Sequence, residues 1–237
     1  MMSRLFLFLL ICSQTVLAAQ NNSPDPDVVL LNEQIKYELK ENYNAVKTVR
    51  RRFLVLNKNG LSRAQFEASY DPFKKITGIK IKVTDLLGNE LTTKEQKTIY
   101  DKSDVHGFSV YEDDRVKYTK ISINVYPVVI QYNYTKDFKE FYPYIHWAAQ
   151  SSPNLKVNKA ELVITYPENR NVRFKMFNMK KQPEITLEKG LNTLKFNVDS
   201  IPAYRSEPYR PPFWEQTPVV FAMPVEFKYH GYAGSFE

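Results

Sequence analysis

Runs in which every second residue is apolar recur along most of this chain. In an extended segment successive side chains point to opposite faces, so such a run has one apolar and one polar face, as in a half-buried strand. Turn-forming residues such as Gly88-Asn89 stand between the runs. Roughly nine to eleven strands can be counted in this way, with no amphipathic helix longer than about three turns. The clearest runs are 35–39, 79–83, 160–166, 172–176 and 194–198.

This pattern predicts an all-β fold, in which residues 19–200 form an antiparallel β-sandwich. The composition agrees with this class. Sixteen tyrosines and 15 phenylalanines favour strands over helices, and a hydrophobic content of 43% is enough to fill a core.

Three local expectations follow from residue type. Asn59-Gly60 is predicted to form a turn, because both residues accept a positive φ. Ile121, Ile123 and Val125 alternate with polar residues and predict a strand. Residues 93–100 fit either a short helix or a loop, and the sequence does not separate the two.

The first 18 residues have the features of a secretory signal peptide. Arg4 supplies the positive start, residues 5–12 are an apolar run, and Val16-Leu17-Ala18 offers a cleavage site. We therefore expect an exported protein, in the periplasm or at the cell exterior of a bacterium. Cys12 is the single cysteine and would leave with the signal, so the mature chain would have no disulfide and no thiolate. No later stretch approaches the roughly 20 apolar residues that span a bilayer.

The net charge of +7 is dispersed along the chain. Its densest basic run is Arg50-Arg51-Arg52, with Lys47 just before it. In a strand this run would be divided between two faces, so a solvated strand is expected and contact with an anionic surface is the alternative. A nucleic-acid partner is not expected for an exported chain.

Residue patterns of known catalytic and metal sites are not found. The sequence has no G-x-S-x-G elbow for a nucleophilic serine, and without Cys12 it has no cysteine nucleophile. His106, His146 and His230 lack the spacing of metal ligands. The acidic triplet at 112–114 lacks the alternating ligands and the glycine of a calcium loop. We therefore expect a protein that is not an enzyme and holds no cofactor or metal.

Two groups of aromatic residues are candidate binding sites. Tyr142, Tyr144 and Trp147 lie close together and could stack on a glycan, although a core or sheet-edge cluster is the alternative. Phe213, Trp214 and Phe221 lie in a proline-rich tail and are of the residue type that anchors protein interfaces.

That tail, residues 201–237, differs from the rest of the chain. Because proline fixes φ and lacks an N–H donor, the tail is expected to contain no regular central strand. It would be an extended strap packed on the sandwich, or a semi-rigid linker toward a following domain. Six prolines fall in a short span: Pro202, Pro208, Pro211, Pro212, Pro218 and Pro224.

Sequence motifs in the tail resemble those of a bacterial exported domain of unknown function that precedes transglutaminase-like domains. The resemblance is carried by Ile-Pro-Ala-Tyr at 201–204, Glu-Pro-Tyr at 207–209, Pro-Pro at 211–212 and Val-Val-Phe-Ala-Met-Pro at 219–224. It implies an immunoglobulin-like β-sandwich without catalytic residues of its own. In relatives a domain with a Cys-His-Asp arrangement follows, and this sequence stops at Glu237, near where such a domain would begin.

Three functional hypotheses follow. The first is a non-enzymatic exported module that packs against or recruits a partner domain, which is transglutaminase-like in relatives. The second is a glycan-binding module of the bacterial cell envelope. The third, a hydrolase with an unrecognised pair of carboxylates, has no motif to support it.

Overall fold

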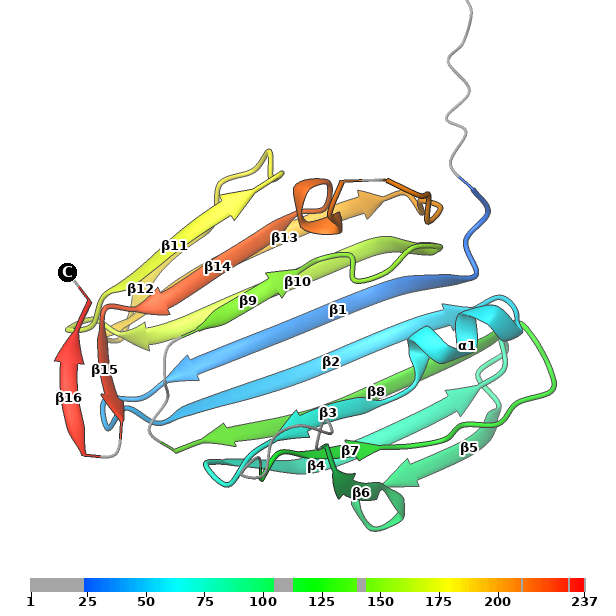
Figure 1. Cartoon of the computed structure of the whole chain (residues 1–237), viewed down its shortest axis with the longest axis horizontal. Coiled ribbons are helices and arrows are strands. Elements are labelled where there is room, and N and C mark those ends of the chain that lie inside the picture. The colour runs from blue at the N-terminus through cyan, green and yellow to red at the C-terminus, as the bar shows by residue number, and fades with distance from the viewer. Residues whose placement is uncertain (1–23, 105–112, 140–143, 210, 230, 237) are drawn as a thin grey trace, which may run out of the picture.

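A computed structural model describes residues 24–104, 113–139, 144–209, 211–229 and 231–236. An eight-stranded sheet forms one layer of the molecule (Figure 1). Its strand order is β12-β13-β10-β1-β2-β8-β4-β5. In chain order these strands are β1 (Val28–Leu39), β2 (Ala45–Val55), β4 (Lys74–Thr84), β5 (Glu90–Glu95), β8 (Val128–Phe138), β10 (Leu155–Pro167), β12 (Glu184–Glu188) and β13 (Leu191–Ile201).

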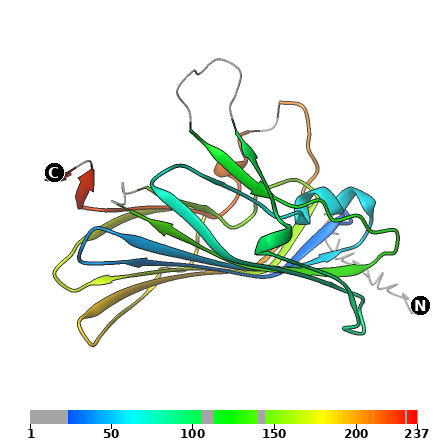
Figure 2. The ribbon, with the colours of Figure 1, turned by 90° about the horizontal axis from the view of Figure 1, so that it is seen from below.

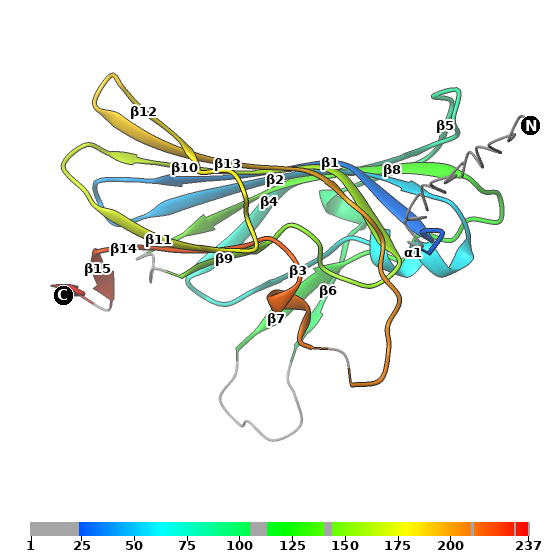
Figure 3. The ribbon, with the colours of Figure 1, turned by 90° about the horizontal axis from the view of Figure 1, so that it is seen from above.

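Two three-stranded sheets cover the same face of this large sheet, as Figures 2 and 3 show from opposite sides. The first has the order β11-β14-β9 and the second β3-β7-β6. Their strands are β3 (Glu67–Tyr70), β6 (Tyr100–Ser103), β7 (Arg115–Tyr118), β9 (Ile145–Ala148), β11 (Val172–Phe177) and β14 (Val219–Pro224). A hairpin, β15 (Glu226–Tyr229) and β16 (Tyr232–Ser235), lies at one end. The helical segments are α1 (Lys58–Ala64), η1 (Gln96–Thr98) and η2 (Phe213–Glu215).

The core lies between the two layers. Leu162, Ile164 and Phe196 are fully buried on the covered face of the large sheet, while Lys195 and Asn197 alternate with them toward the other face. The alternation in the sequence thus reports which side of each strand is covered, and the predicted all-β class is confirmed.

The sheet is not wholly antiparallel. β1 pairs with β2 antiparallel on one side and with β10 parallel on the other. Parallel neighbours need a long connection, and here most of the chain between Leu39 and Leu155 supplies it. Short-range turn signals gave no indication of this pairing.

The turn expected at Asn59-Gly60 is wrong, because these residues lie in α1. The Asn57 side chain caps the helix and accepts hydrogen bonds from the backbone N–H groups of Asn59 and Gly60. Glycine is needed at position 60 for close packing, since a Cβ atom there would lie 2.2 Å from the carbonyl oxygen of Asp27.

The strand expected at 121–125 is also wrong. The Gln65 side chain accepts a hydrogen bond from the Ile121 N–H at 2.9 Å and donates one to its carbonyl oxygen at 3.0 Å. The backbone groups of Ile121 are thus hydrogen-bonded to a side chain, where in a sheet they would be bonded to a neighbouring strand. Residues 93–100 contain the end of β5, the 3-10 turn η1 and the start of β6 at Tyr100.

The expectation that the tail holds no regular central strand is wrong as well. β14 is the middle strand of its sheet, with β11 on one side and β9 on the other. Pro218 and Pro224 stand before and at the end of the paired segment, so every residue from 219 to 223 keeps its N–H donor.

Candidate functional site

The outer face of the β11-β14-β9 sheet carries a group of aromatic side chains. Alternation along the strands places them there: β9 buries Ile145 and Trp147 and leaves His146 exposed between them. β14 buries Val220 and Ala222 and leaves Phe221 only partly covered. Tyr144, just before β9, and Phe177, at the end of β11, are 62% and 39% exposed. We name Tyr144, His146, Phe177 and Phe221 the aromatic surface.

Phe221 is the centre of this surface. It lies opposite His146 in the strand register, and the two rings stack with centroids 4.9 Å apart and planes 7° apart. Phe177 packs edge-on against Phe221 at 5.8 Å, and Tyr144 lies 6.0 Å from it. Lys175 places its ammonium nitrogen 5.1 Å from the Phe177 ring centroid. The rings therefore support one another in fixed positions while part of their area stays in water.

The structure brings together one member of each predicted aromatic group. Phe221, expected to bind a partner, and Tyr144, expected to stack on a glycan, share the aromatic surface. Trp147 does not, since it is 3% exposed and its indole Nε1 donates a 2.7 Å hydrogen bond to Glu33 Oε1. Trp147 thus fits the core alternative. Tyr142 lies outside the described residues.

The other two predicted tail residues lie in η2. Trp214 is 51% exposed, and its carbonyl oxygen accepts a hydrogen bond from Asn178 Nδ2 at 3.1 Å. The same amide nitrogen donates to the carbonyl oxygen of Thr217 at 3.0 Å. Asn178 follows Phe177 directly, so these bonds fix the segment that holds Phe213 and Trp214 beside the aromatic surface.

Sequence reasoning missed His146 and Phe177 as members of this surface. In the sequence His146 is one of three histidines without the spacing of metal ligands, and the apolar run at 172–176 marks the opposite face of β11. Every second residue of β11 lies on the outer face of the sheet. These residues are Arg173, Lys175 and Phe177, so Phe177 shares that face with two charged residues. The pairing of β14 with β11 and β9, which joins these positions into one surface, is not visible in the sequence.

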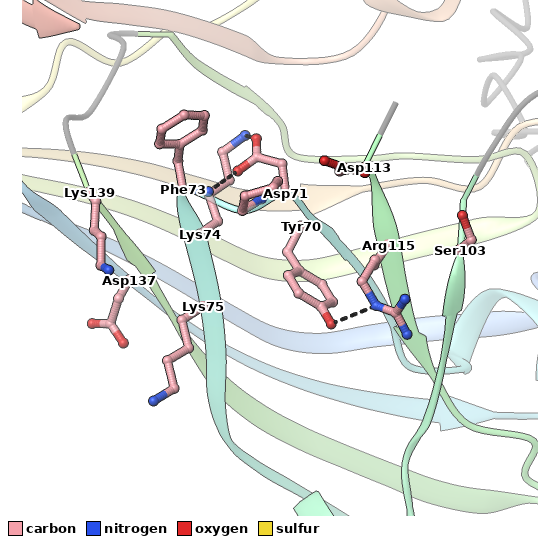
Figure 4. A pocket seen from close by; sticks show the side chains of 11 residues that line it. Tyr70, Asp71, Phe73, Lys74, Lys75, Ser103, Asp113, Arg115, Asp137 and Lys139 are labelled. Atoms are coloured by element: carbon pink, nitrogen blue, oxygen red, sulfur yellow. Dashed lines mark hydrogen bonds and ion pairs between the residues drawn. The ribbon is translucent and has the colours of Figure 1, made fainter. Parts of the chain in front are cut away.

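A cavity of about 570 Å³ lies elsewhere, between the β3-β7-β6 sheet and the ends of β4 and β8 (Figure 4). Tyr70, Asp71, Phe73, Lys74 and Arg115 are among its lining residues. Lys74 forms an ion pair with Asp71, and Arg115 Nε donates to the Tyr70 hydroxyl at 3.2 Å.

Arg115 and Lys117 also bind Asp101, at 2.9 and 2.5 Å. Burial alone would raise the pKa of Asp101, but hydrogen bonds from Lys117 and Tyr70 outweigh this effect and hold the pKa below its usual value. A carboxylate that stays ionised within an ion network is typical of a structural link between strands, and Asp101 is not among the residues that line the cavity.

Residues 41–205 match DUF3857, a family of domains of unknown function with a solved structure. The chain belongs to the DUF3857 family. No curated protein matches the sequence. The match confirms the resemblance to a domain of unknown function, while the association of this DUF3857 chain with transglutaminase-like domains and its export stay predictions.

Solved structures share this fold. A provisionally named protease from Parabacteroides distasonis aligns over 83% of this DUF3857 chain with a TM-score of 0.72 and 13% identity. The chain spans 40% of the length of that protein. A provisionally named nutrient-binding protein from Legionella pneumophila aligns with a TM-score of 0.41, over 84% of this chain and 68% of its own length, at 10% identity. The first similarity shows a common fold and, at 13% identity, nothing about activity.

Proposed function

We propose that this chain is a non-enzymatic interaction module that uses the aromatic surface to bind a partner protein domain. The observation that carries the proposal is the partly exposed ring cluster of Tyr144, His146, Phe177 and Phe221, assembled from three neighbouring segments. Aromatic rings that are held rigidly lose little conformational entropy on binding, and tyrosine is among the residue types enriched at the energetic centres of protein interfaces.

The partner we propose is a transglutaminase-like domain, either in the same polypeptide or in a separate one. Two observations support this choice: the tail motifs resemble those of the domain that precedes transglutaminase-like domains, and the structurally similar Parabacteroides protein is much longer than this chain. The proposal includes export, which rests on the signal-like residues 1–18; these lie outside the described residues. In the part of the chain that the structure describes, no helix has the length and apolar character needed to cross a membrane.

The immunoglobulin-like assignment is part of the same proposal. Two layers of mainly antiparallel strands around one core support a sandwich. The eight-stranded sheet and the parallel β1–β10 pair would make it a variant with one enlarged layer.

Isothermal titration calorimetry against an isolated transglutaminase-like domain tests the proposal. Replacing Phe177 or Tyr144 with Ser should weaken binding by about tenfold or more each, because each change removes a partly exposed anchor ring. Trp214→Ala, next to the surface, should also weaken binding while leaving the unfolding temperature unchanged. Leu87→Ser is the matched control, because Leu87 is 88% exposed in the turn between β4 and β5.

Wild-type affinity in Tyr144→Ser and Phe177→Ser would contradict the proposal, as would an equal loss in the Leu87 control. The glycan alternative now depends on Tyr144, since Trp147 is buried. Tyrosine ring signals in NMR spectra, titrated with cell-wall fragments, distinguish the two functions: a Tyr144 shift with sugar and no heat with the protein domain would favour the glycan module.

A further inference from the structure

Two lysines lie side by side on the covered face of the large sheet. Lys47 in β2 is the direct register partner of Lys136 in β8. Both side chains are half-buried and point the same way as the buried Val49 and Tyr132. The Lys47 ammonium nitrogen lies 5.2 Å from the ring centroid of the buried Tyr37 in β1.

The two small sheets flank this position. On one side Lys136 Nζ donates a 2.6 Å hydrogen bond to the carbonyl oxygen of Ser69 in β3. On the other side Trp147 of β9 donates to Glu33, which lies on β1 four residues before Tyr37. The lysine pair thus lies between β3 and β9, on the middle strands of the large sheet.

The nearest buried acid is already neutralised. Glu33 forms an ion pair with Arg51, and Arg51 also donates a 3.2 Å hydrogen bond to the Tyr132 hydroxyl. Among the described residues neither Lys47 nor Lys136 forms an ion pair. Like charges directly opposite each other in a sheet are destabilising, and half-buried charges without a counter-charge add a desolvation cost.

The electrostatics agree with this geometry. Burial, together with Arg51 and Lys136, lowers the pKa of Lys47 to about 8. Burial and the nearby Lys74 lower the pKa of Lys136 to about 8, although Asp71 and Asp114 act in the opposite direction. Most of both ammonium groups still carry a proton at neutral pH, so this part of the molecule holds positive charge in a partly desolvated setting.

We propose that Lys47 and Lys136 together bind a compact oxyanion, the carboxylate or phosphate group of a small ligand. Beside the N–H that Lys136 donates to Ser69, the two ammonium groups have five N–H donors, and charge-assisted hydrogen bonds to a shared anion would replace their mutual repulsion by attraction. The rings of Tyr37 and Phe138, each within cation–π distance of one lysine, would wall the site with apolar surface. This site lies on the inner face of the large sheet and is separate from the aromatic surface.

NMR of the full chain with ¹³C-labelled lysine tests the proposal directly. Inorganic phosphate and succinate are titrated separately at constant ionic strength, with sodium chloride as the reference salt. The Cε signals of Lys47 and Lys136 should shift saturably with one or both oxyanions, and the pKa of each lysine should rise, because a bound anion favours the charged form. The two titrations show whether phosphate or carboxylate is preferred.

Lys47→Met and Lys136→Met remove the charge but keep most of the stem volume, and each should weaken oxyanion binding by about tenfold or more. Lys36→Met is the control, because Lys36 lies on the opposite face of β1 and pairs with Glu38. If neither Cε signal responds to millimolar phosphate or succinate in the wild-type chain, the proposal is wrong. Equal weakening by the Lys36 variant would also overturn it.

Discussion

At the scale of single residues, the Glu33 carboxylate is a buried acid, only 3% exposed. It is held by Arg51 from β2 and by the Trp147 indole from β9, so one acid joins the large sheet to the sheet that carries the aromatic surface. A buried charge is tolerated only when it is paired and hydrogen-bonded, and here Arg51 supplies the ion pair and the Trp147 indole a further hydrogen bond.

Removing that indole donor should therefore cost stability. We expect Trp147→Phe to lower the free energy of unfolding by about 1–3 kcal/mol, because the ring is largely kept but the buried carboxylate loses a hydrogen bond. Urea denaturation followed by circular dichroism measures the change. Trp214→Phe, at a half-exposed position, is the control and should leave the unfolding midpoint unchanged; an equal loss in both variants would contradict the role given to Trp147.

The two inward lysines predict how stability depends on pH. Their pKa values of about 8 in the folded chain lie below the value of 10.5 expected when unfolded, so between these pH values the unfolded chain binds more protons. Stability should therefore rise as pH increases above about 8. Burial raises the pKa of Tyr134 to about 12. Above about pH 10 the unfolded tyrosine ionises while the folded one keeps its proton, so this residue makes stability fall as pH increases further.

Urea midpoints measured from pH 7 to pH 10 check this window. The double variant with methionine at both lysine positions should lose most of the rise, whereas Lys36→Met should keep it. A wild-type midpoint that falls steadily from pH 8 would contradict the burial of these two ammonium groups.

At the scale of elements, residue patterns predicted strands where one face is covered and the other is wet. The runs in β4, β10 and β13 are of this kind, and each forms a strand close to its expected position. The pattern failed where long-range partners decide the outcome. Ile121 has strand-like spacing, but its backbone N–H and carbonyl oxygen are hydrogen-bonded to the Gln65 side chain and not to a neighbouring strand. The prolines of the tail predict an irregular segment, yet residues 219–223 between two of them pair without interruption in β14.

Residue type predicted two members of the aromatic surface, but local sequence patterns could not predict that they lie together. Tyr144 and Phe221 were identified by residue type, and both lie on the aromatic surface. Their proximity depends on the β9–β14 register, which joins positions more than 70 residues apart and leaves no trace in local periodicity.

β14 should be essential for folding, because it is a central strand with a neighbour on each side. Ala222→Pro removes one N–H from the middle of the strand and should destabilise the chain by about 3 kcal/mol or more. Thermal unfolding monitored by circular dichroism measures the loss. Ser206→Pro is the control and should have little effect, because Ser206 lies in the exposed irregular stretch before η2. An unchanged melting temperature for Ala222→Pro would show that the tail is not part of the folded sheet.

At the scale of the whole molecule, the two layers present different surfaces. The β11-β14-β9 sheet carries the aromatic surface on its outer side. The large sheet places Lys47 and Lys136 beside the apolar core on its covered face, and polar residues such as Lys195 on its outer face. We propose the first of these regions as the binding face for a protein partner and the second as the site for an anionic group.

Export is a prediction about the whole chain as well. When the full sequence is expressed in a bacterium, processing after Ala18 should give a mature chain that begins at Ala19 and lacks Cys12. Intact-mass spectrometry of the periplasmic fraction checks the cleavage site and the loss of the thiol together. A chain that keeps Met1 and stays in the cytoplasm would remove the basis for an extracytoplasmic partner.

Hydrogen–deuterium exchange of the chain with and without a transglutaminase-like domain is the most direct test of the docking role. We predict slower exchange on complex formation in residues 144–148, 172–178 and 213–224, which carry the aromatic surface and η2, and unchanged exchange in the β4–β5 turn. Two results would contradict the assignment of the aromatic surface as the binding face. One is protection confined to the outward face of the large sheet, and the other is no protection when the transglutaminase-like domain is present in excess.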